Sequence, residues 1–105
     1  MDRFENVNEL FIEKFWNRDG ERFYHHQVFN NGKVYIYEVG YSKDDKHWYE
    51  VFKRKVIADV EKIDGKIVTS KTNGHVKYPS NEDFGHWAKN CVSLTDAMQY
   101  AEIWS

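Results

Sequence analysis

Apolar residues recur along the first segment every three or four positions, which is the spacing of an amphipathic helix. The apolar positions are Val7, Leu10, Phe11 and Phe15. Acidic residues are concentrated early in the segment, where the helix dipole favours negative charge, and Asp2 with Glu5 matches a capping box. The pattern predicts a helix from about Arg3 to Trp16, which ends before the glycine of NRDGER.

From Arg22 to about Val60, apolar and polar residues alternate with a period of two, and the segment is rich in β-branched and aromatic side chains. Three strands fit this stretch. Asn31-Gly32 is a strong signal for a hairpin turn, and a second turn is predicted in SKDDKH. Short turns between neighbouring strands predict an antiparallel meander.

The predicted turns set a register and divide the side chains between two faces. With Asn31 and Gly32 as loop residues, Phe29 lies opposite Val34, and the next hairpin places Tyr37 opposite Phe52. One face, the inner face, then holds Tyr24, His26, Val28, Tyr35, Tyr37, Val39 and Glu50. The outer face holds His25, Gln27, Phe29, Val34, Ile36, Glu38, Tyr49, Val51, Lys53, Lys55 and Ile57.

Turn residues divide the following segment. Asp64-Gly65 and Asn73-Gly74 flank a short predicted strand at Lys66–Thr69. The segment from Pro79 to Gly85 predicts a loop, because its Pro, Ser, Asn and Gly residues favour local turns. Trp87 to Val92 is then a predicted strand.

The last segment, SLTDAMQYAEIW, predicts a closing helix. Its apolar residues fall on one helical face: Leu94, Ala97, Met98, Ala101 and Trp104. Ser93 with Asp96 matches a capping box. We expect Leu94, Met98 and Ala101 to be buried against the sheet.

Together these elements predict an α+β fold with an N-terminal helix, an antiparallel meander of four or five strands, and a C-terminal amphipathic helix packed on the sheet. A chain of 105 residues predicts a single domain spanning residues 1–105. The opening residues carry several acids and do not resemble a signal peptide, and no apolar run approaches the ~18 residues of a membrane span. These features predict no membrane association. One cysteine excludes an internal disulfide, which favours a cytoplasmic location.

The sequence predicts neither a metal site nor a cofactor. His25 and His26 are neighbours on a strand and point to opposite faces, so they cannot bind one ion. Cys91 and His86 also face opposite ways on a strand, which argues against a nucleophile and base. The glycines form no P-loop or dinucleotide-binding motif.

The outer face is more apolar than a solvated face requires. Its interface candidates are Phe23, Phe29, Val34, Ile36, Tyr49, Val51, Lys53 and Lys55. A helix of the same chain, a second copy or a partner protein could cover them. We expect a small non-enzymatic interaction protein that binds a protein partner or forms a homodimer through this face or the Pro79–Gly85 loop, with the face covered from outside the chain.

Two alternatives use other chemistry. A small enzyme or ligand-binding domain would have a pocket between sheet and helix, with polar candidates Tyr24, His26, Tyr37 and Glu50. Binding of single-stranded nucleic acid would use a stacking platform made of Phe23, Phe29, Tyr49, Lys53 and Lys55. The net charge of −2 provides no global attraction to nucleic acid.

Overall fold

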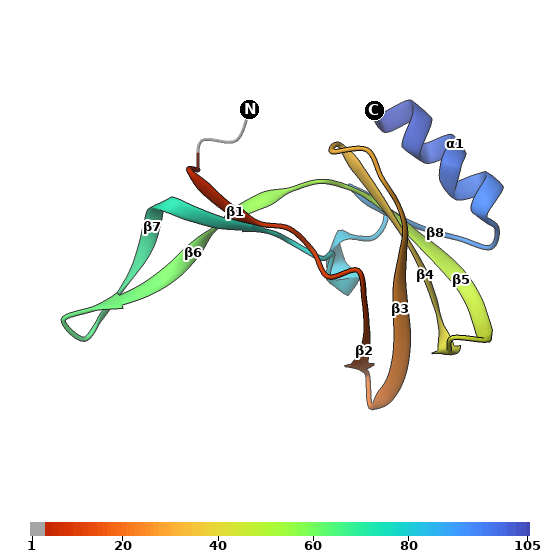
Figure 1. Cartoon of the computed structure of the whole chain (residues 1–105), viewed down its shortest axis with the longest axis horizontal. Helices are drawn as coiled ribbons and strands as arrows, with labels where there is room; N and C mark the ends of the chain where they lie inside the picture. Colours follow the sequence, from red (N-terminus) through yellow and green to blue (C-terminus); the bar gives the residue numbers. More distant parts are fainter. Residues whose placement is uncertain (1–3) are drawn as a thin grey trace. The chain divides into compact units, whose positions relative to one another are not determined.

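A computed structural model describes residues 4–105, except for the side chains of Lys46 and His47. The chain divides into two compact units (Figure 1). Unit 1 comprises the chain up to Leu10 together with Lys55–Tyr78, and unit 2 comprises Phe11–Arg54 together with Pro79–Ser105. The prediction of a single domain stays a prediction.

The predicted α+β fold is wrong, because the protein is mostly β, with 59% strand and 14% helix. Residues of the predicted N-terminal helix form strand β1 (Asn6–Asn8) and the beginning of strand β2 (Glu13–Arg18). The two strands belong to different sheets. The apolar residues with helical spacing therefore do not lie together on one face of a single element. Asp2, the predicted capping residue, lies outside the described residues.

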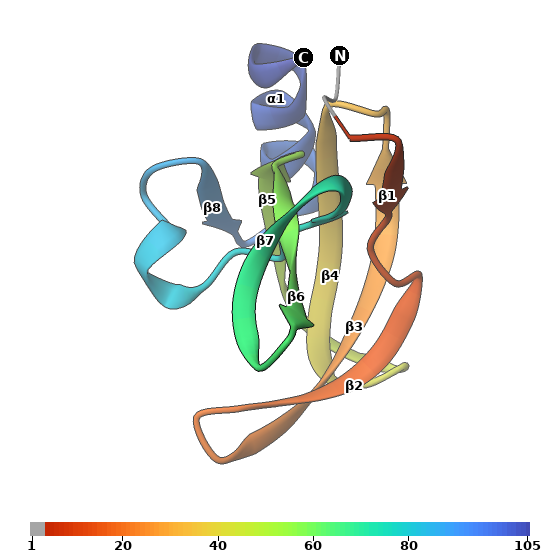
Figure 2. The ribbon, with the colours of Figure 1, turned by 90° about the vertical axis from the view of Figure 1, so that its left-hand side faces the viewer.

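Unit 2 contains a five-stranded antiparallel sheet in the order β2-β3-β4-β5-β8 (Figure 2). Its other strands are β3 (Glu21–Asn30), β4 (Val34–Ser42), β5 (Asp45–Lys53) and β8 (Ala88–Cys91). The strand predicted from Trp87 to Val92 is confirmed as β8. A single 3-10 turn, η1 (Asn81–Asp83), lies in the predicted loop before it.

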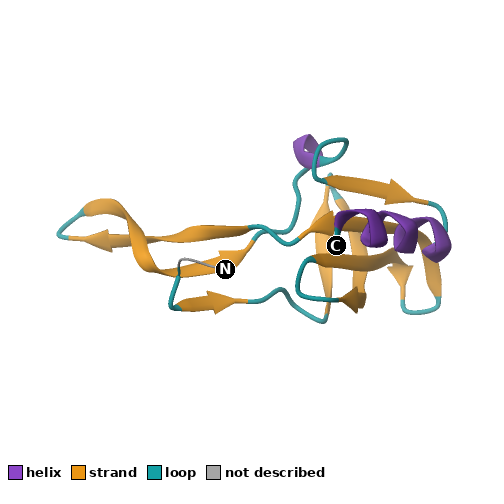
Figure 3. Cartoon of the chain, turned by 90° about the horizontal axis from the view of Figure 1, so that it is seen from above, coloured by secondary structure: helices purple, strands orange, loops and turns teal. Residues whose placement is uncertain are grey.

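Helix α1 (Leu94–Trp104), the longer purple helix in Figure 3, follows β8 and packs against β4, β5 and β8. The predicted helix and its N-cap are confirmed, since the Ser93 side chain accepts a hydrogen bond of 3.2 Å from the Asp96 N–H. Among the helices of residues 4–105, none has the length and apolar character needed to cross a membrane.

The residues of α1 differ in burial from the prediction. Ala101, predicted to be buried, is buried, and so is Ala97. Leu94 and Met98 are 41% and 37% exposed, so the expectation that both are buried is wrong. The two alanines pack against the sheet together with the half-buried Tyr100 and Trp104, while Leu94 and Met98 lie beside this contact.

The loop between β3 and β4 is one residue longer than predicted. It spans residues 31–33, and Phe29 lies opposite Ile36 instead of Val34. The Asn31 side chain explains the loop, because its Oδ1 accepts hydrogen bonds of 2.9 Å from the N–H groups of both Lys33 and Val34.

An irregularity in β3 at Val28 exchanges the faces of the residues that precede it. Gln27 lies opposite Tyr37, and His26 lies opposite Glu38. The side chains before Val28 are therefore on the face opposite to the predicted one: Phe23, Tyr24, His25, His26 and Gln27.

The β4–β5 hairpin retains its predicted faces although its register differs. Tyr37 lies opposite Glu50, not Phe52. A shift of two residues leaves each side chain on the same face, because strand side chains alternate. The predicted continuation of this strand to Val60 is wrong, because strand β6 (Val56–Ile63) belongs to the sheet of unit 1.

Unit 1 contains a three-stranded sheet in the order β1-β7-β6. Strand β7 (Lys66–Val76) contains the predicted strand Lys66–Thr69, pairs antiparallel with β6 and parallel with β1. The Asp64-Gly65 turn is confirmed, with both residues at positive φ. Asn73-Gly74 is not a turn, because Gly74 lies buried within β7.

Candidate binding groove

The predicted interface patch is divided by the fold, and its centre is core. Val34, Ile36 and Val51 are fully buried and pack against Ala97 and Ala101 of α1. The expectation that another chain covers this face is therefore wrong at its centre. The chain covers the face itself, because α1 directly follows β8, the strand next to β5.

The remaining patch residues do not form one surface. Phe29 and Tyr49 are half-buried at the margin of this core, and Lys53 Nζ lies 5.5 Å from the centroid of the Trp104 ring. Phe23 is on the other face, where its ring stacks on Tyr41 with centroids 5.3 Å apart. Lys55 belongs to unit 1.

This separation removes the predicted stacking platform for nucleic acid. Such a platform needs aromatic rings and cations on one accessible face. Phe23 and Phe29 are on opposite faces of the sheet, and the strand irregularity at Val28 lies between them.

The face opposite α1, the aromatic face, is also a core. Tyr35, Tyr37 and Phe52 are fully buried on it. The ring of Phe52 stacks on those of Tyr35 and Tyr37, with centroids 5.7 and 5.8 Å away. Burial raises the pKa of Tyr37 to about 12, which keeps this phenol protonated.

The aromatic face also holds an ion pair between the buried Glu50 and the partly buried Arg18. Arg18 Nη1 donates to both carboxylate oxygens of Glu50 at 3.0 Å, and Trp48 Nε1 donates to Glu50 Oε2 at 2.9 Å. His25 Nε2 lies 3.3 Å from the same arginine nitrogen. Burial lowers the pKa of His25, so the neutral ring is favoured there.

The four predicted pocket residues are consequently not brought together. Tyr37 and Glu50 lie on the aromatic face, whereas Tyr24 and His26 lie on the α1 side of the sheet. The bulge at Val28 is the reason, because it reverses the faces of Tyr24 and His26.

Tyr24 and His26 line a small cavity of about 240 Å³ with Glu13 and Lys43. Tyr24 donates a hydrogen bond to Glu13. This bond lowers the pKa of Glu13 and raises the pKa of Tyr24 to about 12. Lys43 Nζ lies 4.0 Å from Glu13. Glu13 is therefore in contact with Tyr24 and Lys43, and His26 Nδ1 lies 3.1 Å from Glu38 Oε1. The cavity is smaller than the ~300–1,000 Å³ typical of ligand pockets.

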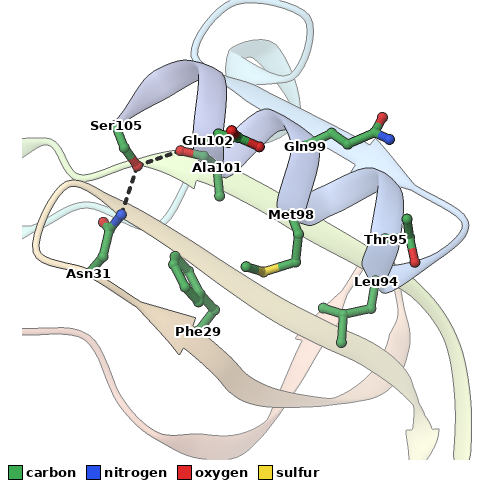
Figure 4. Close-up of a pocket in the computed structure, with 9 residues that line it drawn as sticks. All are labelled: Phe29, Asn31, Leu94, Thr95, Met98, Gln99, Ala101, Glu102 and Ser105. Atoms are coloured by element: carbon green, nitrogen blue, oxygen red, sulfur yellow. Dashed lines mark hydrogen bonds between the residues drawn. The ribbon is translucent and has the colours of Figure 1, made fainter.

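A larger depression, the α1 groove, lies between α1 and the end of β3 (Figure 4). Its volume is about 630 Å³. The apolar lining residues are Phe29, Leu94, Met98 and Ala101. The polar residues around them are Asn31, Thr95, Gln99, Glu102 and Ser105.

Local structure explains the groove. Leu94, Met98 and Ala101 are four and three residues apart and share one side of α1. Figure 4 shows Met98 and Phe29 pointing toward each other from α1 and β3. At one end, Asn31 Nδ2 donates a hydrogen bond of 2.7 Å to Ser105 Oγ, which joins the β3–β4 loop to the end of the helix.

The sequence identified part of this groove. Phe29 was among the predicted interface residues, whereas Leu94 and Met98 were predicted on the buried face of the helix and lie beside it. The spacing of apolar residues shows which side of a helix meets the sheet, but not how far the sheet extends beyond the helix.

Other candidate chemistry is not supported by the geometry. Cys91 is buried, and burial raises the pKa of its thiol, which disfavours the reactive thiolate. In the part of the chain that the structure describes, no three His, Cys, Asp or Glu residues are grouped to hold a metal ion. No protein-family model, curated protein or solved structure matches the chain.

Proposed function

We propose that this protein is a non-enzymatic interaction domain that binds an apolar segment of a partner protein in the α1 groove. One observation carries the proposal: Leu94 and Met98 are 41% and 37% exposed next to Phe29, in a depression of about 630 Å³. Clusters of exposed apolar side chains with a polar rim are typical of protein interaction sites.

The exposed side chains of the groove supply part of the free energy that binding requires. Full burial of a Leu or Met side chain contributes about 1.5–3 kcal/mol. The exposed fractions of Leu94 and Met98 therefore correspond to about 1 kcal/mol each. A partner side chain that enters the groove adds its own burial, and the flexible Met98 can adapt to its shape.

The rim indicates the chemistry of the partner. Glu102 is its one charged side chain, and Asn31, Thr95 and Gln99 offer neutral hydrogen-bonding groups. We therefore propose a partner segment with one or two large apolar side chains and a neighbouring Lys or Arg. The single cysteine agrees with a reducing compartment, and we propose a cytoplasmic location.

A displayed library of random peptides tests the proposal. We expect wild-type protein to enrich peptides that carry an apolar anchor beside a basic residue. Synthetic versions should bind Met98→Lys at least about tenfold more weakly, because a charge enters the groove and an apolar contact is lost.

Val92→Lys is the matched control, because Val92 is 85% exposed and outside the groove. It should bind the peptides like wild type, and circular dichroism should show that both variants are folded. Failure to enrich such peptides, or equal binding by Met98→Lys, would refute the proposed function.

A further inference from the structure

The distal part of the β6–β7 hairpin, residues 60–69 of unit 1, carries a second group of exposed apolar side chains. Val60, Ile63 and Ile67 are 67%, 53% and 76% exposed, and Val68 is 36% exposed. The two strands and their turn are visible in Figure 1. Four such residues in so short a segment are more than a solvated hairpin requires.

The hairpin is two-stranded in this part. Strand β1 pairs with β7 only at residues 73–75. Ser70 Oγ accepts hydrogen bonds from the N–H groups of Thr72 and Asn73, at 3.3 and 3.0 Å, where the β6–β7 register is interrupted. Among the described strands, none pairs with the outer edge of β7 over Lys66–Thr69.

An isolated two-stranded hairpin has marginal stability in water, and its open edges present backbone groups to another strand. We propose that the outer edge of β7 pairs antiparallel with the same edge of a second copy of this chain, about a two-fold axis at Val68. The result is a continuous four-stranded sheet in the order β6-β7-β7-β6.

Charges in the middle of the distal part of β6 disfavour its outer edge. A two-fold axis normal to a sheet places the residue on the axis opposite its own copy. On β6, an axis at Glu61 or Lys62 brings two like charges together, and an axis at Val60 places Asp59 opposite Glu61. Like charges directly opposite each other are destabilising.

The β7 edge has no such conflict. An axis at Val68 places Val68 opposite its copy, Ile67 opposite Thr69 and Lys66 opposite Ser70. The central pairs are all β-branched, which is favourable across strands.

The same pairing covers apolar surface. Val60 lies opposite Thr69, and Ile67 lies opposite Lys62 across the hairpin, so Val60 and Ile67 share one face. In the four-stranded sheet, each Ile67 lies opposite Thr69 of the other hairpin, and Val60 of that hairpin lies on the far side of Thr69 in the same row. The two Val68 side chains meet on the opposite face.

The turn argues against a lipid surface as the occupant. Asp64 forms the tip of the hairpin, with Glu61 close to it in the strand. Carboxylates at the tip would have to enter the membrane before the apolar side chains do, which is costly.

A charge exchange at the two-fold axis tests the proposal. Sedimentation equilibrium over a dilution series should show wild type changing from dimer to monomer mass. Val68→Lys and Val68→Glu should each be monomeric, because like charges face each other at the axis. An equimolar mixture of the two variants should recover the dimer, because Lys then faces Glu.

Recovery in the mixture also shows that neither variant is misfolded. Val92→Lys, which changes an exposed valine outside the hairpin, should dimerise like wild type. A monomeric wild type at every concentration, or a Val68→Lys variant that remains dimeric, would overturn the proposal. Failure of the α1 groove to bind peptides would not affect it, since the groove and the hairpin share no residue.

Discussion

At the scale of single residues, His25 shows how burial can set a protonation state. The side chain is fully buried, with Arg18 Nη1 at 3.3 Å from its Nε2. Desolvation is the main cause of its lowered pKa. Glu50 acts in the opposite direction, and the charges of Arg18 and Lys14 add to the lowering.

This lowered pKa predicts a loss of stability in mild acid. An unfolded histidine binds a proton near pH 6.5, whereas His25 in the folded chain does so only at lower pH. The unfolded state therefore binds more protons as the pH falls below about 6.5, and the free energy of unfolding decreases until the folded pKa is passed.

Urea unfolding at pH 7 and pH 5 measures this effect. We expect His25→Gln to lose less stability between these values than wild type does. His86→Gln, at an exposed position, is the control and should retain the wild-type pH dependence. An unchanged pH dependence in His25→Gln would show that another group is responsible.

At the scale of elements, α1 depends on its packing and on its cap. Ala97 and Ala101 are the fully or nearly fully buried helix residues, and the half-buried Tyr100 and Trp104 pack against the same core. This contact holds one side of the helix on the sheet. The first N–H groups of a helix have no partner within it, so a cap at the N-terminus also contributes to its stability.

The cap gives a prediction for this element. Ser93→Ala removes the acceptor of the Asp96 N–H and should lower the free energy of unfolding by about 1 kcal/mol. Ser93→Asn keeps an acceptor and should have a smaller effect. Urea unfolding compares the two, and equal losses would show that the hydrogen bond is not the cause.

At the scale of the whole molecule, the two units raise the question of cooperativity. The chain passes between them three times, after Leu10, Arg54 and Tyr78. Unit 1 has fewer than about 40 residues, below the size that usually folds alone. We therefore expect both units to unfold in one transition, as the prediction of a single domain requires.

Hydrogen exchange of Ile36→Ala tests this expectation. Ile36 is fully buried in unit 2, so the substitution should cost about 2–5 kcal/mol. The slowest amides of β4 in unit 2 and of β6 in unit 1 should exchange faster by the same factor. Met98→Ala, at a half-exposed position, should change both much less. Unchanged exchange in β6 would mean that the units unfold separately.

The candidate site was predictable where local patterns carried the information. Apolar spacing placed Leu94 and Met98 on one side of a helix, and the outer-face assignment included Phe29. What the sequence did not reveal is that α1 packs on β4, β5 and β8 and leaves Phe29 at an open margin. That arrangement depends on where a connection places a helix, which side-chain periodicity does not encode.

By itself, the sequence determined that three strands lie between residues 21 and 53, and it determined the strand β8 and the capped helix α1, but not the registers of the two hairpins. Alternation, turn residues and capping act between near neighbours, so they can be read locally. Only the tertiary structure decided that the first segment forms strands β1 and β2, that Val28 reverses the faces of β3, and that Ile36 is core. Each of these depends on pairing with segments far away in the chain, and such pairing overrides local periodicity when it buries more apolar surface.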